Sequence, residues 1–230
     1  IKQLLSRKYA KQRQGSISMS EASSELNAGN INVEQGIGTG DTTHLDAVDK
    51  EGNMISATQS GGWIQSSPII EGLGFPLGTR MQMFVLDEKK NNCLQPRKRP
   101  RTTLSPSLVL KNNQPYLAFG TLGGDLQDQV NLQFLLNFTI FKMNLQQALD
   151  APTFHTQHMP GSFYPRVAYP KRVVVEDRIP KNVVEELVKR GHDVKLVSGW
   201  SNGRVSAVHK NNEILMAGAS PRTPCGAWST

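Results

Sequence analysis

The sequence predicts an α+β protein in which paired strands pack against separate long helices. Two observations lead to this class. Three pairs of short strand-like runs are each joined by a tight polar turn, and two longer segments carry helical periodicity. A length of 230 residues is enough to bury a sizeable core.

The three strand pairs are expected to form hairpins, because Asn or Gly in each connection supplies the conformations that tight turns need. The pairs comprise residues 44–49 with 54–60, 107–110 with 116–120, and 204–209 with 213–217. Hairpins of this kind indicate antiparallel sheet.

Two segments are expected to be helical. Residues 128–143 are apolar nearly all round, which predicts a helix buried between layers. Residues 181–190 follow Pro180, a residue favoured in the first turn, and stop at Gly191, a typical C-terminal cap. The apolar positions of this second helix form one stripe.

The first 41 residues differ in character from the rest. Residues 2–14 are polar and basic and are expected to be helical, whereas residues 15–40 are rich in Ser, Asn and Gly and resemble an exposed linker. We therefore divide the chain into residues 1–41 and 42–230. Since the chain starts at Ile1 rather than Met, we expect it to begin within a longer product.

Basic residues outnumber acidic ones, 26 to 19, for a formal net charge of +7. One short cluster stands out, comprising Arg97, Lys98, Arg99 and Arg101. A solvated loop is the favoured interpretation, with positive potential near an anionic substrate as the alternative. No nucleic acid partner is expected, because neither a nucleic-acid motif nor interleaved aromatic residues accompany the charge.

No metal, cofactor or membrane segment is expected. Cys93 and Cys225 match neither a metal pattern nor a redox CxxC and are expected to be reduced and unpaired. His44, His155 and His158 lack a supporting carboxylate motif, which favours hydrogen-bonded or surface histidines over a metal site. No apolar run approaches the ~20 residues of a membrane helix.

A set of short motifs across residues 42–230 resembles the small subunit of γ-glutamyltranspeptidases, in order and spacing. The motifs are Thr42-Thr43-His44, Val48-Asp49, Gly52-Asn53, Ser56-Ala57-Thr58, Arg99-Pro100, Ser105-Pro106, Gly123-Gly124, and Ala148 followed by Asp150-Ala151-Pro152. Residues 60–68 and 77–80 are more similar to the divergent γ-glutamyltransferase-like or cephalosporin-acylase-like branch. Residues 1–41 then resemble the end of the large subunit.

This resemblance implies an N-terminal-nucleophile hydrolase with an αββα sandwich, of which this chain is the C-terminal part. The precursor is expected to cut itself between Asp41 and Thr42. The freed Thr42 is then both nucleophile and, through its α-amine, base. A Thr hydroxyl needs such a base, and an α-amine with a pKa of about 7.7–8.0 is partly unprotonated near neutral pH.

The resemblance also implies roles for five further residues. Ser60 is expected to hydrogen-bond the nucleophile, and the backbone N–H groups of Gly123 and Gly124 to form the oxyanion hole. Without the resemblance, the glycine pair would indicate a tight turn, and both interpretations are compatible. Thr102 and Thr103 match hydroxyls that bind the donor's α-carboxylate, with β-branched strand residues as the alternative.

Two departures alter the expected substrate. Met83 stands where transpeptidases hold the donor's ammonium with an acidic residue, and Gly62 or Trp63 stands in place of an Asn. A buried ammonium without a carboxylate is costly. This disfavours glutathione and favours a glutaryl-type acyl group or an unusual γ-glutamyl compound. Arg80 is expected to bind a carboxylate, with a surface ion pair as the alternative.

The sequence therefore predicts an autoprocessing amidohydrolase or acyltransferase that forms an acyl-enzyme on Thr42. Its expected partners are a large subunit from the same precursor and a small γ-glutamyl or glutaryl amide. The alternative is a catalytically degenerate relative that binds an acylated metabolite without turnover. A degenerate precursor would stay uncut between Asp41 and Thr42.

Overall fold

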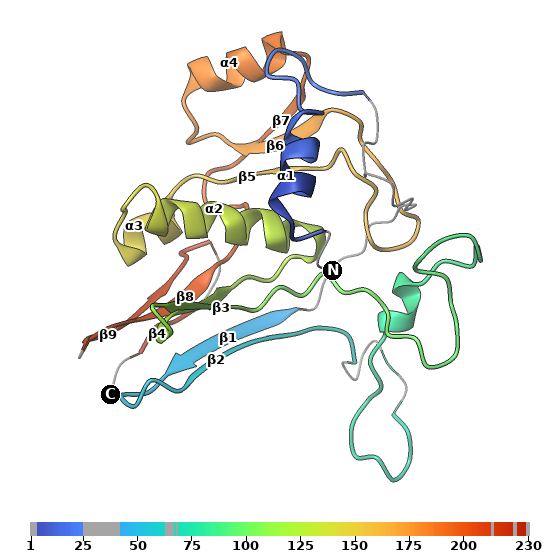
Figure 1. The fold of residues 1–230 in the computed structure, drawn as a ribbon, viewed down its shortest axis with the longest axis vertical. Helices are drawn as coiled ribbons and strands as arrows, with labels where there is room; N and C mark the ends of the chain where they lie inside the picture. The colour runs from blue at the N-terminus through green and yellow to red at the C-terminus, as the bar shows by residue number, and fades with distance from the viewer. Residues whose placement is uncertain are drawn as a thin grey trace.

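The computed structural model describes residues 4–24, 42–62, 67, 69–212, 214–222 and 225–228. Its centre is a four-stranded sheet with two helices on one face and a two-stranded sheet on the other (Figure 1). The central strands, in spatial order, are β3 (Ser107–Lys111), β4 (Gln114–Gly120), β8 (Ser206–Asn211) and β9 (Ile214–Ala219). The predicted α+β class is confirmed.

All three predicted hairpins are present. In the two-stranded sheet, β1 (Thr43–Val48) pairs antiparallel with β2 (Met54–Gln59), and the other two hairpins are β3–β4 and β8–β9. Their turns use positive φ at Gly52, Asn112, Asn113 and Asn212, as the turn residues predict.

The main core lies between the central sheet and two helices, α2 (Gln127–Thr139) and α3 (Leu145–Asp150). Its fully buried members are Leu117, Phe119, Val130, Phe134, Leu145, Ala148, Leu149, Val205 and Ala207. Burying each large side chain contributes roughly 1.5–3 kcal/mol. A capping box between Asn144 and Gln147 starts α3 and fixes its direction against α2.

The predicted helix at residues 128–143 forms as α2, but the expectation that it is buried all round is wrong. Its outer face carries Leu132 and Leu136, which are 56% and 39% exposed. The described residues cover α2 with the central sheet through β4 and with β5 along its Gln129 and Gln133 side, and they leave the Leu132 side uncovered. Leu45 and Ile55 are similarly exposed on the outer face of the β1–β2 sheet. The chain thus presents two apolar outer faces.

A third sheet was not predicted. It consists of β5 (Phe154–Thr156), β6 (Arg172–Glu176) and β7 (Asp193–Val197), with β6 and β7 parallel. The expected helix at residues 181–190 is α4 (Lys181–Lys189), which connects these two strands. A run of three valines in β6 before α4 was the available signal for a βαβ unit.

The N-terminal segment lies against this third sheet unit. The predicted helix within residues 2–14 forms as α1 (Arg7–Gln14), and Ser6 caps it. Beyond α1, Arg190 Nη1 donates to the Met19 carbonyl at 2.6 Å, and the Ala22 N–H donates to the Arg190 carbonyl at 2.8 Å. None of the described helices has the length and apolar character required to cross a membrane.

A buried ion pair between Glu176 and Arg222 joins the C-terminal segment to the third sheet. Glu176, at the end of β6, is fully buried and accepts hydrogen bonds from Arg222 Nε (2.7 Å) and Nη2 (2.9 Å). Arg178 and the Asn202 N–H donate to the same carboxylate. Burial alone would raise the Glu176 pKa, but these hydrogen bonds outweigh it and lower the pKa to about 2.

The depressed pKa predicts acid-sensitive stability. The Glu176 contribution is fully present above about pH 4.5, the unfolded value, and is lost as the pH falls towards 2. A shift of this size corresponds to about 3 kcal/mol. Urea unfolding of the full-length precursor should show this loss in the wild type. Glu176→Gln should be less stable at pH 7 and show a flatter pH dependence, whereas exposed Glu185→Gln should follow the wild type. Equal slopes in all three proteins would contradict the assignment.

Candidate active site

The first contact of the site joins the two strands of the β1–β2 hairpin at its open end. Thr42 Oγ1 donates to Ser60 Oγ at 2.9 Å, one step beyond the register pair Thr43–Gln59. Both side chains are partly buried, so the Thr42 hydroxyl has a fixed direction. Asp41, and with it the predicted processing bond, lies outside the described residues.

A second polar pair lies directly along the strand from Thr42. His44 Nε2 donates to Asp46 Oδ2 at 2.9 Å, since a carboxylate only accepts, and His44 Nδ1 lies 2.7 Å from Thr58 Oγ1. Ser206 Oγ, from β8, also donates to Asp46 at 3.0 Å. The side chains of His44 and Asp46 are almost inaccessible to solvent. Sequence reasoning missed this pair, although period-two alternation places residues 42, 44 and 46 on one face.

Gly120, at the end of β4, provides the space that His44 occupies. A Cβ at Gly120 would lie 2.3 Å from His44 Cε1, far inside contact distance. The two sheets therefore approach closely here, and the His44 ring fills the gap.

Gly123 and Gly124 form the turn between β4 and α2, and both have positive φ, 125° and 61°. A Cβ at Gly123 would also press against Leu126 at 3.0 Å. The backbone therefore requires glycine here, which accounts for the tight turn. The start of β1 and the start of α2 lie at the same end of the sandwich (Figure 1).

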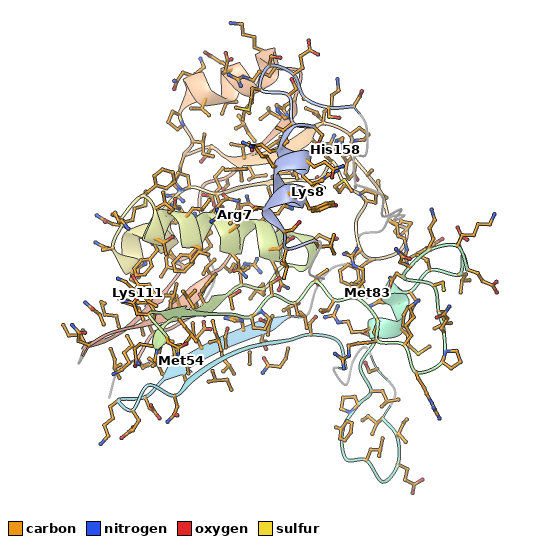
Figure 2. The ribbon with its side chains drawn as sticks, in the orientation of Figure 1. Arg7, Lys8, Met54, Met83, Lys111 and His158 are labelled. Atoms are coloured by element: carbon orange, nitrogen blue, oxygen red, sulfur yellow. The ribbon has the colours of Figure 1, made fainter. Side chains whose placement is uncertain are left out.

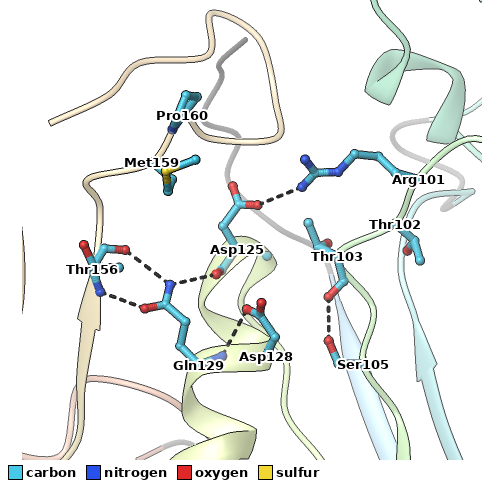
Figure 3. A pocket seen from close by; sticks show the side chains of 11 residues that line it. Arg101, Thr102, Thr103, Ser105, Asp125, Asp128, Gln129, Thr156, Met159 and Pro160 are labelled. Carbon is cyan, nitrogen blue, oxygen red and sulfur yellow. Dashed lines mark hydrogen bonds and ion pairs between the residues drawn. The ribbon is translucent and has the colours of Figure 1, made fainter. Parts of the chain in front are cut away.

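A cavity of about 420 Å³ opens beside Gly124 and contains both predicted threonines (Figure 3). Thr102 Oγ1 accepts the Leu104 N–H at 3.1 Å. β3 begins only at Ser107, so the alternative that Thr102 and Thr103 are strand residues is wrong. They lie in a polar segment that lines the cavity.

Arg101 lies in an exposed loop, as expected, and it also lines this cavity. Its guanidinium lies 3.6 Å from Asp125 and also donates to Ser162 (Figure 3). The Ser162 N–H donates to Asp125 at 2.7 Å. Arg101 therefore belongs to a fixed charged group beside Gly124. Its position directly before the two threonines was the available signal.

Arg80 reaches the other side of Gly124. It begins the short 3-10 helix η1 (Arg80–Met83), and its guanidinium lies 5.9 Å from the Phe163 ring centroid. A Cβ on Gly124 would lie 3.5 Å from the same ring. Arg80 therefore contacts the ring beside Gly124, but it does not line the cavity that holds Thr102 and Thr103.

The described residues at the positions where the resemblance places an ammonium-binding group, Met83 and Gly62, supply no charge. Met83 is fully buried within the η1 segment, which lies apart from the helical layer (Figure 2). Gly62 has positive φ, and a Cβ there would lie 3.3 Å from the Leu77 carbonyl oxygen. Trp63 lies outside the described residues.

The histidines considered as metal ligands are separated. His155 Nδ1 lies 2.7 Å from Asn202 Oδ1, and His158 Nδ1 accepts the Lys171 N–H at 2.9 Å. In the described part of the chain, no group of three or more His, Cys, Asp or Glu side chains gathers to hold a metal. The cysteines are unpaired, with Cys93 buried and Cys225 exposed.

Comparison with known proteins gives a consistent result over nearly the whole chain. The family model described as Gamma-glutamyltranspeptidase matches residues 1–229. The glutathione hydrolase-like YwrD proenzyme of Bacillus subtilis is 30% identical over 226 residues, which is 96% of this chain and 40% of that protein. The Acylase ACY 1 proenzyme of Pseudomonas sp. strain SE83 is 29% identical and is matched over 36% of its length.

Solved structures agree. A structure of LmbA2991HD superposes with a TM-score of 0.86 and 42% identity, covering 96% of this chain and 42% of that one. Cephalosporin acylase from Bacillus halodurans superposes with a TM-score of 0.75 and 30% identity, covering 99% and 39%. The chain therefore spans about two fifths of the length of these relatives.

The close approach of Gly120 to His44 predicts a local steric effect. Gly120→Ala should destabilise the full-length protein by about 1–3 kcal/mol, because the added methyl group must displace the His44 ring or the backbone. Gly78→Ala is the matched control, since nothing lies within 4 Å of a Cβ there. Denaturant midpoints of the two variants measure the difference. A Gly120→Ala protein as stable as the control would contradict the described packing.

Proposed function

The chain belongs to the gamma-glutamyltranspeptidase family, and on that premise we propose that it carries the nucleophile of an autoprocessing amidohydrolase or acyltransferase. Its layers are those of the N-terminal-nucleophile hydrolase fold, of which it corresponds to the C-terminal part. The observation that carries the proposal is the hydrogen bond from Thr42 Oγ1 to Ser60 Oγ. It lies at the same end of the sandwich as the Gly123–Gly124 turn.

In the proposed maturation, Thr42 Oγ attacks the carbonyl carbon of residue 41. The peptide C–N bond breaks, the acyl group moves to the Thr42 oxygen as an ester, and water hydrolyses that ester. The products are a carboxylate at Asp41 and a free α-amine on Thr42. The hydroxyl proton of Thr42 ends on the departing nitrogen, which becomes the α-amine. Ser60 favours this step because its Oγ accepts a hydrogen bond from the Thr42 hydroxyl and so fixes the direction of the attacking oxygen.

In the proposed reaction, the same oxygen attacks a substrate amide. The Thr42 α-amine takes the hydroxyl proton and then delivers it to the departing amine. The backbone N–H groups of Gly123 and Gly124 would donate hydrogen bonds to the oxyanion that forms. Neither residue has a Cβ that could obstruct its approach. Collapse leaves an acyl ester on Thr42. Water or an acceptor amine then attacks the ester, and the Thr42 α-amine again takes the proton of the attacking group.

The cavity beside Gly124 suits an acyl chain that ends in a carboxylate. The hydroxyls of Thr102 and Thr103 line it, and Arg101 adds a positive charge at its edge. With Met83 buried and uncharged, a glutaryl group fits better than a γ-glutamyl group. Asp128, which also lines the cavity, favours the second candidate, an unusual γ-glutamyl compound whose ammonium it would meet.

We further propose that residues 1–41 are the end of a large subunit cut from the same precursor. The rest of that subunit would cover the apolar outer faces of α2 and of the β1–β2 sheet. Retention of the Thr42–Ser60 contact and of both glycines supports turnover over the degenerate binding alternative.

Self-cleavage tests the nucleophile directly. The full-length precursor should yield two fragments, the smaller beginning at Thr42, whereas Thr42→Ala should remain one chain because the attacking hydroxyl is gone. Thr43→Ala is the matched control, since its exposed hydroxyl contacts only the Gln59 side chain. Intact mass spectrometry distinguishes the products. An uncut wild type would favour the degenerate alternative.

Substrate choice tests the acyl cavity. The processed protein should hydrolyse glutaryl amides faster than matched γ-glutamyl amides. Thr103→Val should raise KM for a glutaryl amide roughly 10-fold with little change in kcat, because it removes binding shared by ground and transition states. Thr139→Val, at the far end of α2, is the isosteric control. A preference for γ-glutamyl amides would instead support the ammonium role of Asp128.

A further inference from the structure

A second cavity, of about 170 Å³, lies on the other side of the Gly123–Gly124 turn. It shares Gly124, Asp125 and two further residues with the polar cavity, so the two meet at the glycine pair. Its remaining wall is mostly apolar, with Leu126, Phe163, Val167 and Tyr169 as its main side chains. A cavity of ~150 Å³ is enough to hold one benzene ring.

The two aromatic rings that line this cavity, Phe163 and Tyr169, each contact an arginine guanidinium. The Arg80 guanidinium lies 5.9 Å from the centroid of the Phe163 ring, and the Arg172 guanidinium lies 4.2 Å from that of Tyr169. The intervening loop is fixed to η1, since Arg166 donates to the carbonyl oxygens of Gln82 and Phe84 at 3.1 and 2.7 Å. The cavity is therefore formed before a ligand arrives.

The wall also includes polar residues, of which His155 is the one with a shifted pKa. Burial lowers the pKa of His155, and this outweighs the hydrogen bond with Asn202, which raises it. Nδ1 donates to Asn202 Oδ1, and Nε2 lies 3.4 Å from the Gln157 amide nitrogen. Both ring nitrogens therefore face neutral amide groups, which suits an uncharged, ring-sized ligand beside them better than an ion.

We propose that this second cavity binds the amine side of the scissile amide and selects an aromatic or branched apolar leaving group. The inference rests on the proposed function. If the carbonyl oxygen lies at the glycine N–H groups and the acyl chain lies in the polar cavity, the remaining substituent of the carbonyl is directed across Gly124. The apolar cavity lies on that side of the glycine pair.

The test compares glutaryl benzylamide with glutaryl ethylamide on the processed full-length protein. The wild type should favour the benzylamide in kcat/KM by roughly 10-fold or more, the gain expected from burying one ring. Val167→Asp places a charge in the cavity wall at a partly exposed position and should bring the ratio close to one while sparing the ethylamide. Val188→Asp, on the exposed face of α4, is the control. An unchanged ratio in Val167→Asp overturns the proposal.

A binding measurement separates this inference from the proposed function. If no amide is hydrolysed, the proposed function fails, and titration of the full-length protein with N-benzylacetamide tests the cavity alone. Binding that Val167→Asp weakens and Val188→Asp does not would retain an aromatic-binding cavity. Absence of binding would overturn it. The assignment would also be overturned if an aromatic ring raised kcat/KM when carried on the acyl group but not when carried on the amine.

Discussion

The buried pair of Glu176 and Arg222 is the contact on which the arrangement of the layers depends. Arg222 also donates to the carbonyl oxygens of Leu149 and Ala151, at the end of α3, while Glu176 accepts the Thr153 N–H at the start of β5. One ion pair therefore joins the helical layer, the third sheet and the C-terminal segment. Two desolvated charges are tolerated because nearly every lone pair and N–H has a partner. Thr156, three residues after Thr153, lines both cavities, so the pair also fixes a wall of the site.

The two faces of the central sheet are built on different principles. The helical face is a close-packed apolar core, whereas the face towards β1 and β2 carries a buried polar row of Thr42, His44 and Asp46. Such a row costs desolvation unless its members are paired, and Thr58 and Ser206 provide those partners. The polar row stabilises one relative position of the two sheets, because a one-residue slip would leave a charge unpaired.

Local sequence signals predicted the elements whose ends are set by turn and capping residues. The three hairpins followed from Asn and Gly turns, and α4 from Pro180 and Gly191. The third sheet was missed because its parallel strands are joined by a helix and not by a tight turn, so no turn residues marked the pairing. The exposed face of α2 was missed because periodicity reports apolar character and not what covers it. At the site, the contact between Thr42 and Ser60 was predicted, and Arg101 was named as an alternative, whereas the pairing of His44 with Asp46 was recognised only from its three-dimensional contacts.

The contact between Gly120 and His44 also has an evolutionary consequence. The two residues share one volume, so the size of the side chain permitted at position 120 depends on the ring at position 44. A lineage that kept His44 would retain glycine at position 120 under purifying selection, and a lineage that exchanged His44 for a small residue would release that constraint. We therefore expect the two positions to drift together across related sequences, as a coupled pair on opposing sheets.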